Sequence, residues 1–259
     1  MTLHVLRDGG DDLAVVLLHG FPLDHRMWTA VAGRLTAPHR VLAADLPGAA
    51  GADADLPEPS VEAAADRVAA ELAEAGVTRA VVVGLSMGGY VALALAERHA
   101  PLVAALGLVD TKSTADTADA RANRLRIADE AESTGTVDPV RGMATTLVGE
   151  STRAAQPDVT AQLAAWIDEQ SPGGVAWAQR AMASRPDRTD VLAAFDGPVV
   201  VVVGDEDAVT PVAAAEHLAS SARDAQLVVV PRSGHMSAVE QPGAVAAALD
   251  DLVQRVVSS

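Results

Sequence analysis

The stretch Val81-Val82-Val83-Gly84-Leu85-Ser86-Met87-Gly88-Gly89 decides the fold of this chain. A short run of β-branched residues leads into a Gly-x-Ser-x-Gly sequence, and an apolar segment of helical length follows it. A serine between a strand and a helix must lie on a sharp turn with strained backbone angles, where glycines two residues before and after it avoid a steric clash. The pattern therefore predicts that the Ser86 hydroxyl lies in solvent, at the positive end of a helix.

Short, continuous apolar runs recur on both sides of this motif and predict further strands. They are Leu13–Leu18, Val41–Ala44, Ala80–Val83, Val103–Val109, Val199–Val203 and Leu227–Val230. Their continuous apolarity is typical of strands that are covered on both faces. Segments of helical length and composition lie between them, at Met27–Thr36, Val61–Ala75, Met87–Arg98, Val212–Ser221 and Ala244–Val256. This alternation predicts an α/β fold, a mostly parallel twisted sheet with helices on both faces.

The alternation is interrupted once, between Thr111 and about Ala194. No strand-like run occurs there, and the pattern indicates helices near Ala118–Ser133, Pro139–Gly149, Val159–Gln170 and Gly173–Ala183. We expect residues 1–110 and 195–259 to form the α/β core domain, and residues 111–194 to form a helical cap inserted over the edge of the sheet where the strands end. A purely structural helical insertion is the alternative.

Composition and charge exclude several classes of function. The chain has 259 residues, 49% of them hydrophobic, and a formal net charge of −16. Such a charge repels nucleic acid and anionic lipid, so we expect neither nucleic acid nor membrane as a partner. The absence of cysteine excludes disulfides, thiolate metal sites and a cysteine nucleophile. Residues 1–12 lack the pattern of a signal peptide, which favours a cytoplasmic location.

A serine hydroxyl becomes a nucleophile when a base takes its proton and an acid orients that base. His235 follows the last predicted strand, and Asp207 follows the strand Val199–Val203. Because the carboxyl ends of parallel strands meet at one edge of the sheet, both side chains share that edge with Ser86. Asp110, at the end of another strand, is the alternative acid.

The chain resembles the α/β-hydrolase superfamily over nearly its whole length. The resemblance rests on His19-Gly20-Phe21-Pro22, Asp45-Leu46-Pro47-Gly48, the turn at Ser86, Gly204–Asp207 with Thr210-Pro211, and Gly234-His235. It is most similar to the 3-oxoadipate enol-lactonase and small carboxylesterase branch. The resemblance implies that Ser86 is the nucleophile, His235 the general base and then acid, and Asp207 the orienting carboxylate. It also implies an oxyanion hole formed by the backbone N–H groups of Phe21 and Met87, with His19 bracing the loop that carries Phe21.

The function that follows is hydrolysis of small-molecule carboxylic esters or enol-lactones, without cofactor or metal, through an acyl-enzyme intermediate. The cap is rich in alanine and has few aromatic residues and no clustered arginine, which favours a small, neutral, fairly apolar ester. The same triad also serves cofactor-free haloperoxidases (perhydrolases) and hydroxynitrile lyases, and these remain alternatives. Outside the enzymes, a slow-turnover ligand-sensing receptor of the same fold is a further alternative.

Several other residues are weaker candidates for substrate binding. They are His25, Met143, Leu147, Trp166, Trp177 and Met182. His25 lies on the predicted catalytic edge, where capping of a helix is an equally good interpretation. The five residues of the predicted cap would line the acyl pocket, although apolar side chains at helical spacing also pack against one another.

Overall fold

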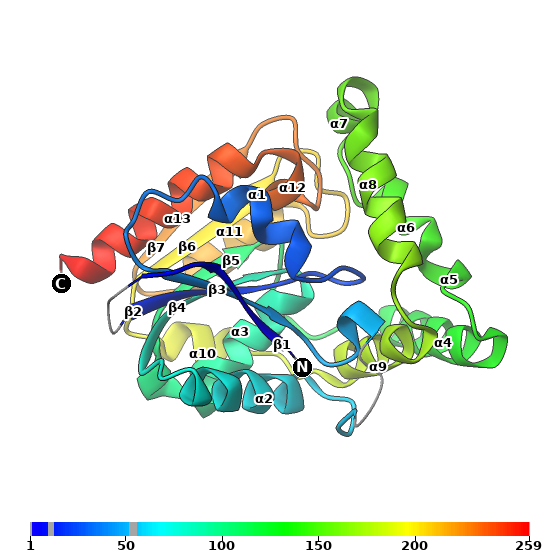
Figure 1. Ribbon diagram of the computed structural model, residues 1–259, viewed down its shortest axis with the longest axis horizontal. Helices are drawn as coiled ribbons and strands as arrows, with labels where there is room; N and C mark the ends of the chain where they lie inside the picture. Colours follow the sequence, from blue (N-terminus) through cyan, green and yellow to red (C-terminus); the bar gives the residue numbers. More distant parts are fainter. Residues whose placement is uncertain (1, 10–12, 52–55, 259) are drawn as a thin grey trace.

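A seven-stranded sheet forms the centre of the molecule in the computed structural model, which describes residues 2–9, 13–51 and 56–258 (Figure 1). Residues 1 and 10–12 of the N-terminal stretch lie outside this range. The strands are β1 (Thr2–Arg7), β2 (Leu13–Leu18), β3 (Arg40–Asp45), β4 (Arg79–Leu85), β5 (Val103–Val109), β6 (Val199–Gly204) and β7 (Ala225–Val230). They are ordered β1-β3-β2-β4-β5-β6-β7.

All pairs in the sheet are parallel except β1 with β3, which are antiparallel. The sequence predicted the six parallel strands and missed β1. The reason is burial: every residue of β2 is buried, whereas every residue of β1 is at least partly exposed, so its sequence TLHVLR mixes polar and apolar residues. An edge strand of this kind lacks the continuous apolar run by which a covered strand is recognised.

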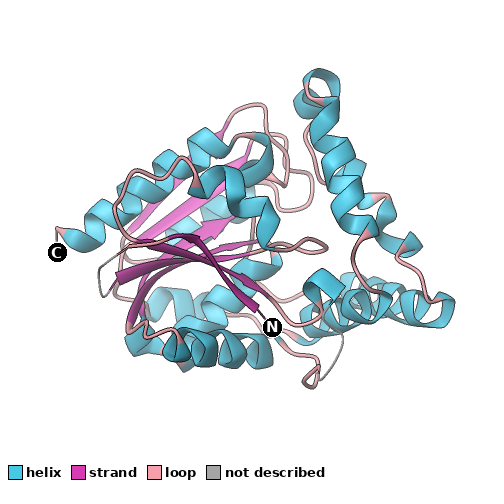
Figure 2. Cartoon of the chain, viewed as in Figure 1, coloured by secondary structure: helices cyan, strands magenta, loops and turns pink. Residues whose placement is uncertain are grey.

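Helices cover both faces of the sheet (Figure 2). On one face lie α1 (Thr29–Ala32), α12 (Ser237–Glu240) and α13 (Pro242–Val257), which contact one another. On the other lie α2 (Val61–Glu74), α3 (Met87–Arg98), α10 (Thr189–Ala194) and α11 (Val212–Ser221), linked by contacts of α3 with α2 and of α10 with α3 and α11. Short 3-10 turns occur at η1 (His25–Trp28), η2 (Ala49–Gly51) and η3 (Ala100–Leu102). The expected α/β architecture, a mostly parallel sheet with helices on both faces, is confirmed.

All regular secondary structure between β5 and β6 in the described residues is helical. It contains α4 (Ala118–Thr134), α5 (Asp138–Arg141), α6 (Met143–Thr146), α7 (Glu150–Ala155), α8 (Pro157–Asp168), α9 (Pro172–Ser184) and finally α10. Figure 1 shows α4 to α9 standing beside the sheet as a separate group, with α4 and α9 packed side by side. Only α10 leaves this group to join the helices under the sheet.

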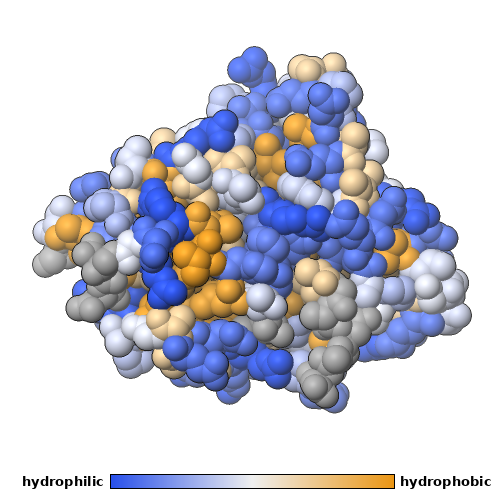
Figure 3. Space-filling model, viewed as in Figure 1, coloured by the Kyte–Doolittle hydropathy of each residue, from blue (hydrophilic) through white to orange (hydrophobic). Residues whose placement is uncertain are grey.

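The molecular surface in the view of Figure 3 is mainly hydrophilic, as the charge predicts. A hydrophobic band lies left of centre, where Figure 1 shows the edge of the sheet at β1 and β3. Val5 of β1 is 53% exposed. Within the described residues, no helix combines the length and the apolar character that crossing a membrane requires.

Candidate active site

Ser86 lies on the turn between β4 and α3, as the Gly-x-Ser-x-Gly motif predicts. Its backbone φ is +53°, in a region that residues with a side chain rarely adopt. A Cβ atom on Gly84 would lie 2.1 Å from the carbonyl oxygen of Gly88, and one on Gly88 would lie 2.2 Å from that of Leu18. Glycine is therefore required at both positions, because the turn presses β4, α3 and β2 together at their backbones.

His235 brings its imidazole to Ser86 from the loop after β7. Its Nε2 lies 2.9 Å from Ser86 Oγ, and its Nδ1 lies 2.8 Å from Asp207 Oδ2. Asp207 is on the loop after β6. The three side chains are separated by 149 and 28 residues along the sequence and are all buried. They meet because parallel strands deliver their following loops to one edge of the sheet.

Asp207 is held by a compact set of hydrogen bonds. Its Oδ1 accepts from the backbone N–H groups of Val209 and Thr210 (2.8 and 2.9 Å), and its Oδ2 accepts from the Thr210 hydroxyl at 2.7 Å. Burial by itself would raise the pKa of Asp207, but the hydrogen bonds and charge of His235, together with Thr210, lower the pKa below its ordinary value. Asp207 is therefore an ionised acceptor at neutral pH, facing His235 Nδ1.

Asp110 occupies a different position. Its Oδ1 accepts from the backbone N–H of Gly204, and its Oδ2 from that of Ser237, each at 3.0 Å. Burial and the negative charge of Asp207 raise the pKa of Asp110 well above its usual range. The Asp110 carboxyl group thus links the end of β6 to the start of α12. His235 pairs with Asp207 instead.

The loop of His235 is held by Glu240 of α12, which sequence reasoning did not single out. The Glu240 carboxylate accepts from the backbone N–H groups of Gly149 (2.8 Å), Gly234 (3.0 Å) and Met236 (3.1 Å). A carboxylate five residues after a candidate base is the sequence signal that could have found Glu240, and the structure shows that this side chain is buried. It joins both sides of His235 to the segment between α6 and α7.

A small cavity lies against the amino end of α3. The core contributes Phe21 and Met87 to its walls, and the helical insertion contributes Gln170 and α9. Its lining residues are His19, Phe21, Pro22, Leu23, Pro47, Gly48, Ala49, Met87, Gln170, Gly174, Val175 and Ala178. Most of these side chains are apolar or small, so the cavity suits an apolar group that approaches Ser86 from the side of Phe21 and Met87.

His19 supports the loop that contains Phe21. Its Nε2 accepts from the backbone N–H of Leu46 at 2.9 Å, and its Nδ1 lies 3.1 Å from the carbonyl oxygen of Gly20. Burial lowers the pKa of His19, which keeps the ring neutral. The imidazole is thus a bridge between this loop and the residue after β3.

Comparison with known proteins places the chain in a family. The sequence model described as the alpha/beta hydrolase family matches residues 15–248. The chain belongs to the alpha/beta hydrolase family. The match covers most of the chain and includes both the Ser86 turn and the loops of Asp207 and His235.

The relatives of this α/β hydrolase include esterases. A pimeloyl-[acyl-carrier protein] methyl ester esterase of Aromatoleum aromaticum is 33% identical over 254 residues, which cover 93% of this chain and 98% of that protein. A solved thermophilic esterase of Thermogutta terrifontis, with malate bound, is 36% identical, with a TM-score of 0.90 and coverage of 98% and 93% of the two chains. The enol-lactonase of Burkholderia xenovorans shares the fold, at 23% identity, a TM-score of 0.85 and coverage of 97% and 96%. The predicted class, an α/β-fold hydrolase acting on ester bonds, is thereby confirmed.

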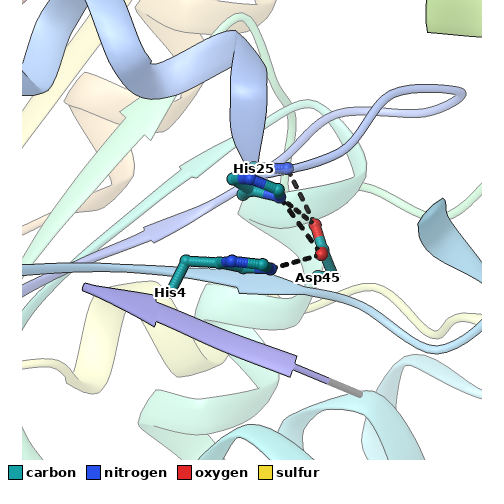
Figure 4. A group of neighbouring side chains, drawn as sticks. All are labelled: His4, His25 and Asp45. Atoms are coloured by element: carbon teal, nitrogen blue, oxygen red, sulfur yellow. Dashed lines mark hydrogen bonds and ion pairs between the residues drawn. The ribbon is translucent and has the colours of Figure 1, made fainter. Parts of the chain in front are cut away.

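The six weaker candidates for substrate binding make contacts away from the cavity at Phe21 and Met87. His25 faces Asp45 and stacks on His4 (Figure 4). The backbone carbonyl oxygen of Leu147 accepts a hydrogen bond from the backbone N–H of His235 at 2.8 Å. The Trp166 ring lies under the guanidinium of Arg26, at 5.6 Å.

The remaining three candidates are also engaged elsewhere. The indole N–H of Trp177 donates to the carbonyl oxygen of Pro57 at 2.6 Å, and the sulfur of Met182 lies 3.3 Å from Arg124 Nη1. Met143 is half-buried and packs on the hydrophobic core. None of the six residues lines the cavity at Phe21 and Met87, whereas Gln170, Gly174, Val175 and Ala178 of the insertion do. Sequence spacing identified apolar faces correctly but not which of them face the cavity.

Proposed function

We propose that this α/β hydrolase cleaves small-molecule carboxylic esters or lactones through Ser86, His235 and Asp207, by way of an acyl-enzyme intermediate. The observation that carries the proposal is the continuous chain of contacts from Ser86 Oγ through both ring nitrogens of His235 to the carboxylate of Asp207, at 2.9 and 2.8 Å. These distances are those of hydrogen bonds already formed, so no rearrangement is needed for proton transfer.

The carboxylate of Asp207 sets the direction of proton transfer. An ionised acceptor at Nδ1 keeps the proton of the neutral imidazole on that nitrogen, which leaves the Nε2 lone pair facing Ser86 Oγ. As Ser86 Oγ forms its bond to the substrate carbonyl carbon, the hydroxyl proton moves to His235 Nε2. The imidazolium that results is stabilised by Asp207, whose carboxylate is already fixed by Thr210.

Negative charge then develops on the carbonyl oxygen. We assign the backbone N–H groups of Phe21 and Met87 as its hydrogen-bond donors, because both residues border the cavity beside Ser86 and Met87 begins α3. Backbone donors and a helix amino end are fixed before the reaction and favour charge that appears in the transition state. Each donor of this kind contributes about 10²- to 10³-fold to the rate.

Departure of the alcohol completes acylation, and water then attacks the acyl-enzyme. His235 Nε2–H gives its proton to the departing alkoxide or enolate oxygen as the bond between that oxygen and the acyl carbon breaks. Water, deprotonated by the same nitrogen, attacks the acyl-Ser86 ester. Collapse of the second tetrahedral intermediate returns the proton to Ser86 Oγ and releases the carboxylic acid.

The cavity supports a fairly apolar substrate, because its walls are mostly apolar. The relatives named for a methyl ester favour an ester with a small alcohol part. We propose the insertion at residues 111–194, apart from α10, which packs with the core helices, as a cap on the core formed by residues 1–110 and 195–259. This insertion supplies Gln170 and three residues of α9 to the cavity wall.

Labelling with a fluorophosphonate probe tests the nucleophile. We expect one label on each chain, at Ser86, none in Ser86→Ala, and a loss of ester hydrolysis in that variant by about 10⁴-fold or more. A label that persists in Ser86→Ala would refute the assignment. Ser113→Ala is the matched control, because Ser113 is also buried but hydrogen-bonds to Thr189, and we expect it to keep both label and activity.

A series of p-nitrophenyl esters, from acetate upward, together with small lactones, tests the substrate class. We expect kcat/KM to peak at short acyl chains and to fall when the acyl group outgrows the cavity. Turnover at the uncatalysed rate on every substrate would instead favour the ligand-sensing receptor. Halogenation on addition of peroxide and a short carboxylic acid would reveal perhydrolase activity of the same site.

A further inference from the structure

Two histidines and one aspartate meet at the edge of the sheet, on β1, η1 and the end of β3 (Figure 4). His4 Nε2 lies 2.6 Å from Asp45 Oδ2, and His25 Nδ1 lies 2.9 and 3.1 Å from the two Asp45 oxygens. The two imidazole rings are stacked, with centroids 3.5 Å apart and planes 14° from parallel. One nitrogen of each ring therefore points to the same carboxylate.

The strand register explains why these residues meet. His4 is paired with Ala43 in the antiparallel ladder of β1 and β3, so Asp45 is its diagonal neighbour on the same face. His25 lies at the start of η1, and its backbone N–H also donates to Asp45 Oδ1 at 2.9 Å. The ladder already holds β1 in place, so the side-chain cluster is not needed to fix the strand.

The electrostatics of the cluster favour a cation. Both oxygens of the Asp45 carboxylate face the two imidazoles. A second carboxylate oxygen, Asp24 Oδ1, lies 4.0 Å from His25 Nδ1, although Arg26 neutralises it. The site thus combines two imidazole nitrogens with one carboxylate.

We propose that His4 Nε2, His25 Nδ1 and a carboxylate oxygen of Asp45 bind a divalent transition-metal ion, best Zn²⁺. Two imidazole nitrogens and one carboxylate form a ligand set that Zn²⁺ and Ni²⁺ prefer over Mg²⁺ and Ca²⁺, which take oxygen ligands. The three ligand atoms lie within 4.8 Å of one another, and water completes the coordination. This site is separate from Ser86, and the proposed hydrolysis does not depend on it.

Binding requires two local changes. In the metal-bound state the ring proton lies on the other nitrogen, Nδ1 in His4 and Nε2 in His25, so that the ligating nitrogen presents its lone pair. The rings also turn out of their stack, because a metal ion lies in the plane of each ring that binds it. The His4 and His25 side chains are 30% and 21% exposed, and β1 is an edge strand, so both rings have room to turn.

Titration of Zn²⁺ into the EDTA-treated protein, without an affinity tag, tests the proposal by calorimetry and by thermal unfolding. We expect one ion for each chain, a micromolar or lower Kd, and a rise in Tm with metal concentration. His4→Gln and His25→Gln should each weaken binding by about tenfold or more, as the loss of one ligand from three requires. Co²⁺ should bind at the same site and give a visible d–d absorption that Zn²⁺ abolishes.

His99→Gln is the matched control, because His99 also lies 2.8 Å from an aspartate, Asp66, which it shares with the guanidinium of Arg98. We expect unchanged metal binding in this variant. Circular dichroism and Tm without metal show whether each variant is folded. The proposal is overturned if Zn²⁺ binds the wild-type protein with a Kd above about 100 µM, because that affinity is roughly a hundredfold weaker than expected. Equal binding by folded His4→Gln and His25→Gln variants would also overturn it.

Discussion

The backbone N–H of His235 donates to the carbonyl oxygen of Leu147 at 2.8 Å. The loop that carries the proposed general base is thus bound directly to the helical insertion. Glu240 reinforces the connection, since its carboxylate accepts from Gly149 on the insertion and from Gly234 and Met236 on either side of His235. The position of the imidazole therefore depends on the insertion as well as on the sheet.

Replacing Glu240 by glutamine should lower kcat more than it changes KM. The amide NH₂ of glutamine would face backbone N–H donors that now bind a carboxylate oxygen, so the loop of His235 must shift. A displacement of this kind costs about 10- to 100-fold in kcat. Separate determination of kcat and KM on a p-nitrophenyl ester checks this. Glu206→Gln is the control, because the Glu206 side chain binds the insertion at Ser151 and reaches the loop of His235 only through its backbone N–H, which this substitution keeps. We expect a much smaller effect in this variant.

The two buried aspartates should respond differently to substitution by asparagine. We expect Asp207→Asn to lower kcat by about 10⁴-fold, because an amide no longer holds the proton on His235 Nδ1. Asp110→Asn should change kcat by less than about tenfold, since Asp110 contacts backbone N–H groups rather than the imidazole. Steady-state rates of both variants decide the matter, and the reverse order of effects would make Asp110 the acid.

Gly84→Ala should destabilise the protein severely. The new methyl group would lie 2.1 Å from the carbonyl oxygen of Gly88, a backbone atom that cannot move without displacing α3. We expect a loss of about 3 kcal/mol or more in the free energy of unfolding, measured with urea. Gly142→Ala is the control, because a Cβ there meets nothing within 4 Å and its φ is −63°, and this variant should be as stable as the wild type or slightly more so. Equal midpoints for the two variants would contradict the steric explanation.

Asp24 should make the stability of the protein dependent on acid pH. Burial alone would raise the pKa of Asp24, but hydrogen bonds from Arg26 lower it to about 2, from an ordinary value of 3.8. Because the folded-state pKa is the lower one, the stabilisation is present above about pH 4 and is lost as the pH falls toward 2. The difference in unfolding free energy between wild type and Asp24→Asn should shrink by about 2 kcal/mol from pH 6 to pH 2. A difference that does not vary with pH would show that Asp24 has no such role.

The sequence was sufficient for the parts of the fold that repeat a local pattern. Six strands were recognised from their continuous apolar runs, whereas β1 was missed because its sequence TLHVLR mixes polar and apolar residues. The turn at Ser86 was predictable because its steric requirement acts between residues only four apart, Gly84 and Gly88. The edge of the sheet that carries Asp207 and His235 was predictable because topology alone brings their loops there.

The walls of the cavity were not predictable in the same way. Trp177 and Ala178 are adjacent in α9, yet the indole bonds to Pro57 while the alanine borders the cavity. Which of two neighbouring faces looks inward depends on how the helix is rotated against the core. Helical periodicity alone carries no information on that rotation.

By itself, then, the sequence determined the α/β alternation, the elbow at Ser86 and the shared edge for its candidate partners, because strand burial, turn sterics and parallel topology act through local pattern. Only the tertiary structure decided that Asp207 rather than Asp110 faces His235, that Glu240 and Leu147 hold the loop of His235, and that His4 and His25 share Asp45. The physical reason is that these choices depend on side-chain direction and on contacts between segments far apart in the chain, which no local pattern specifies.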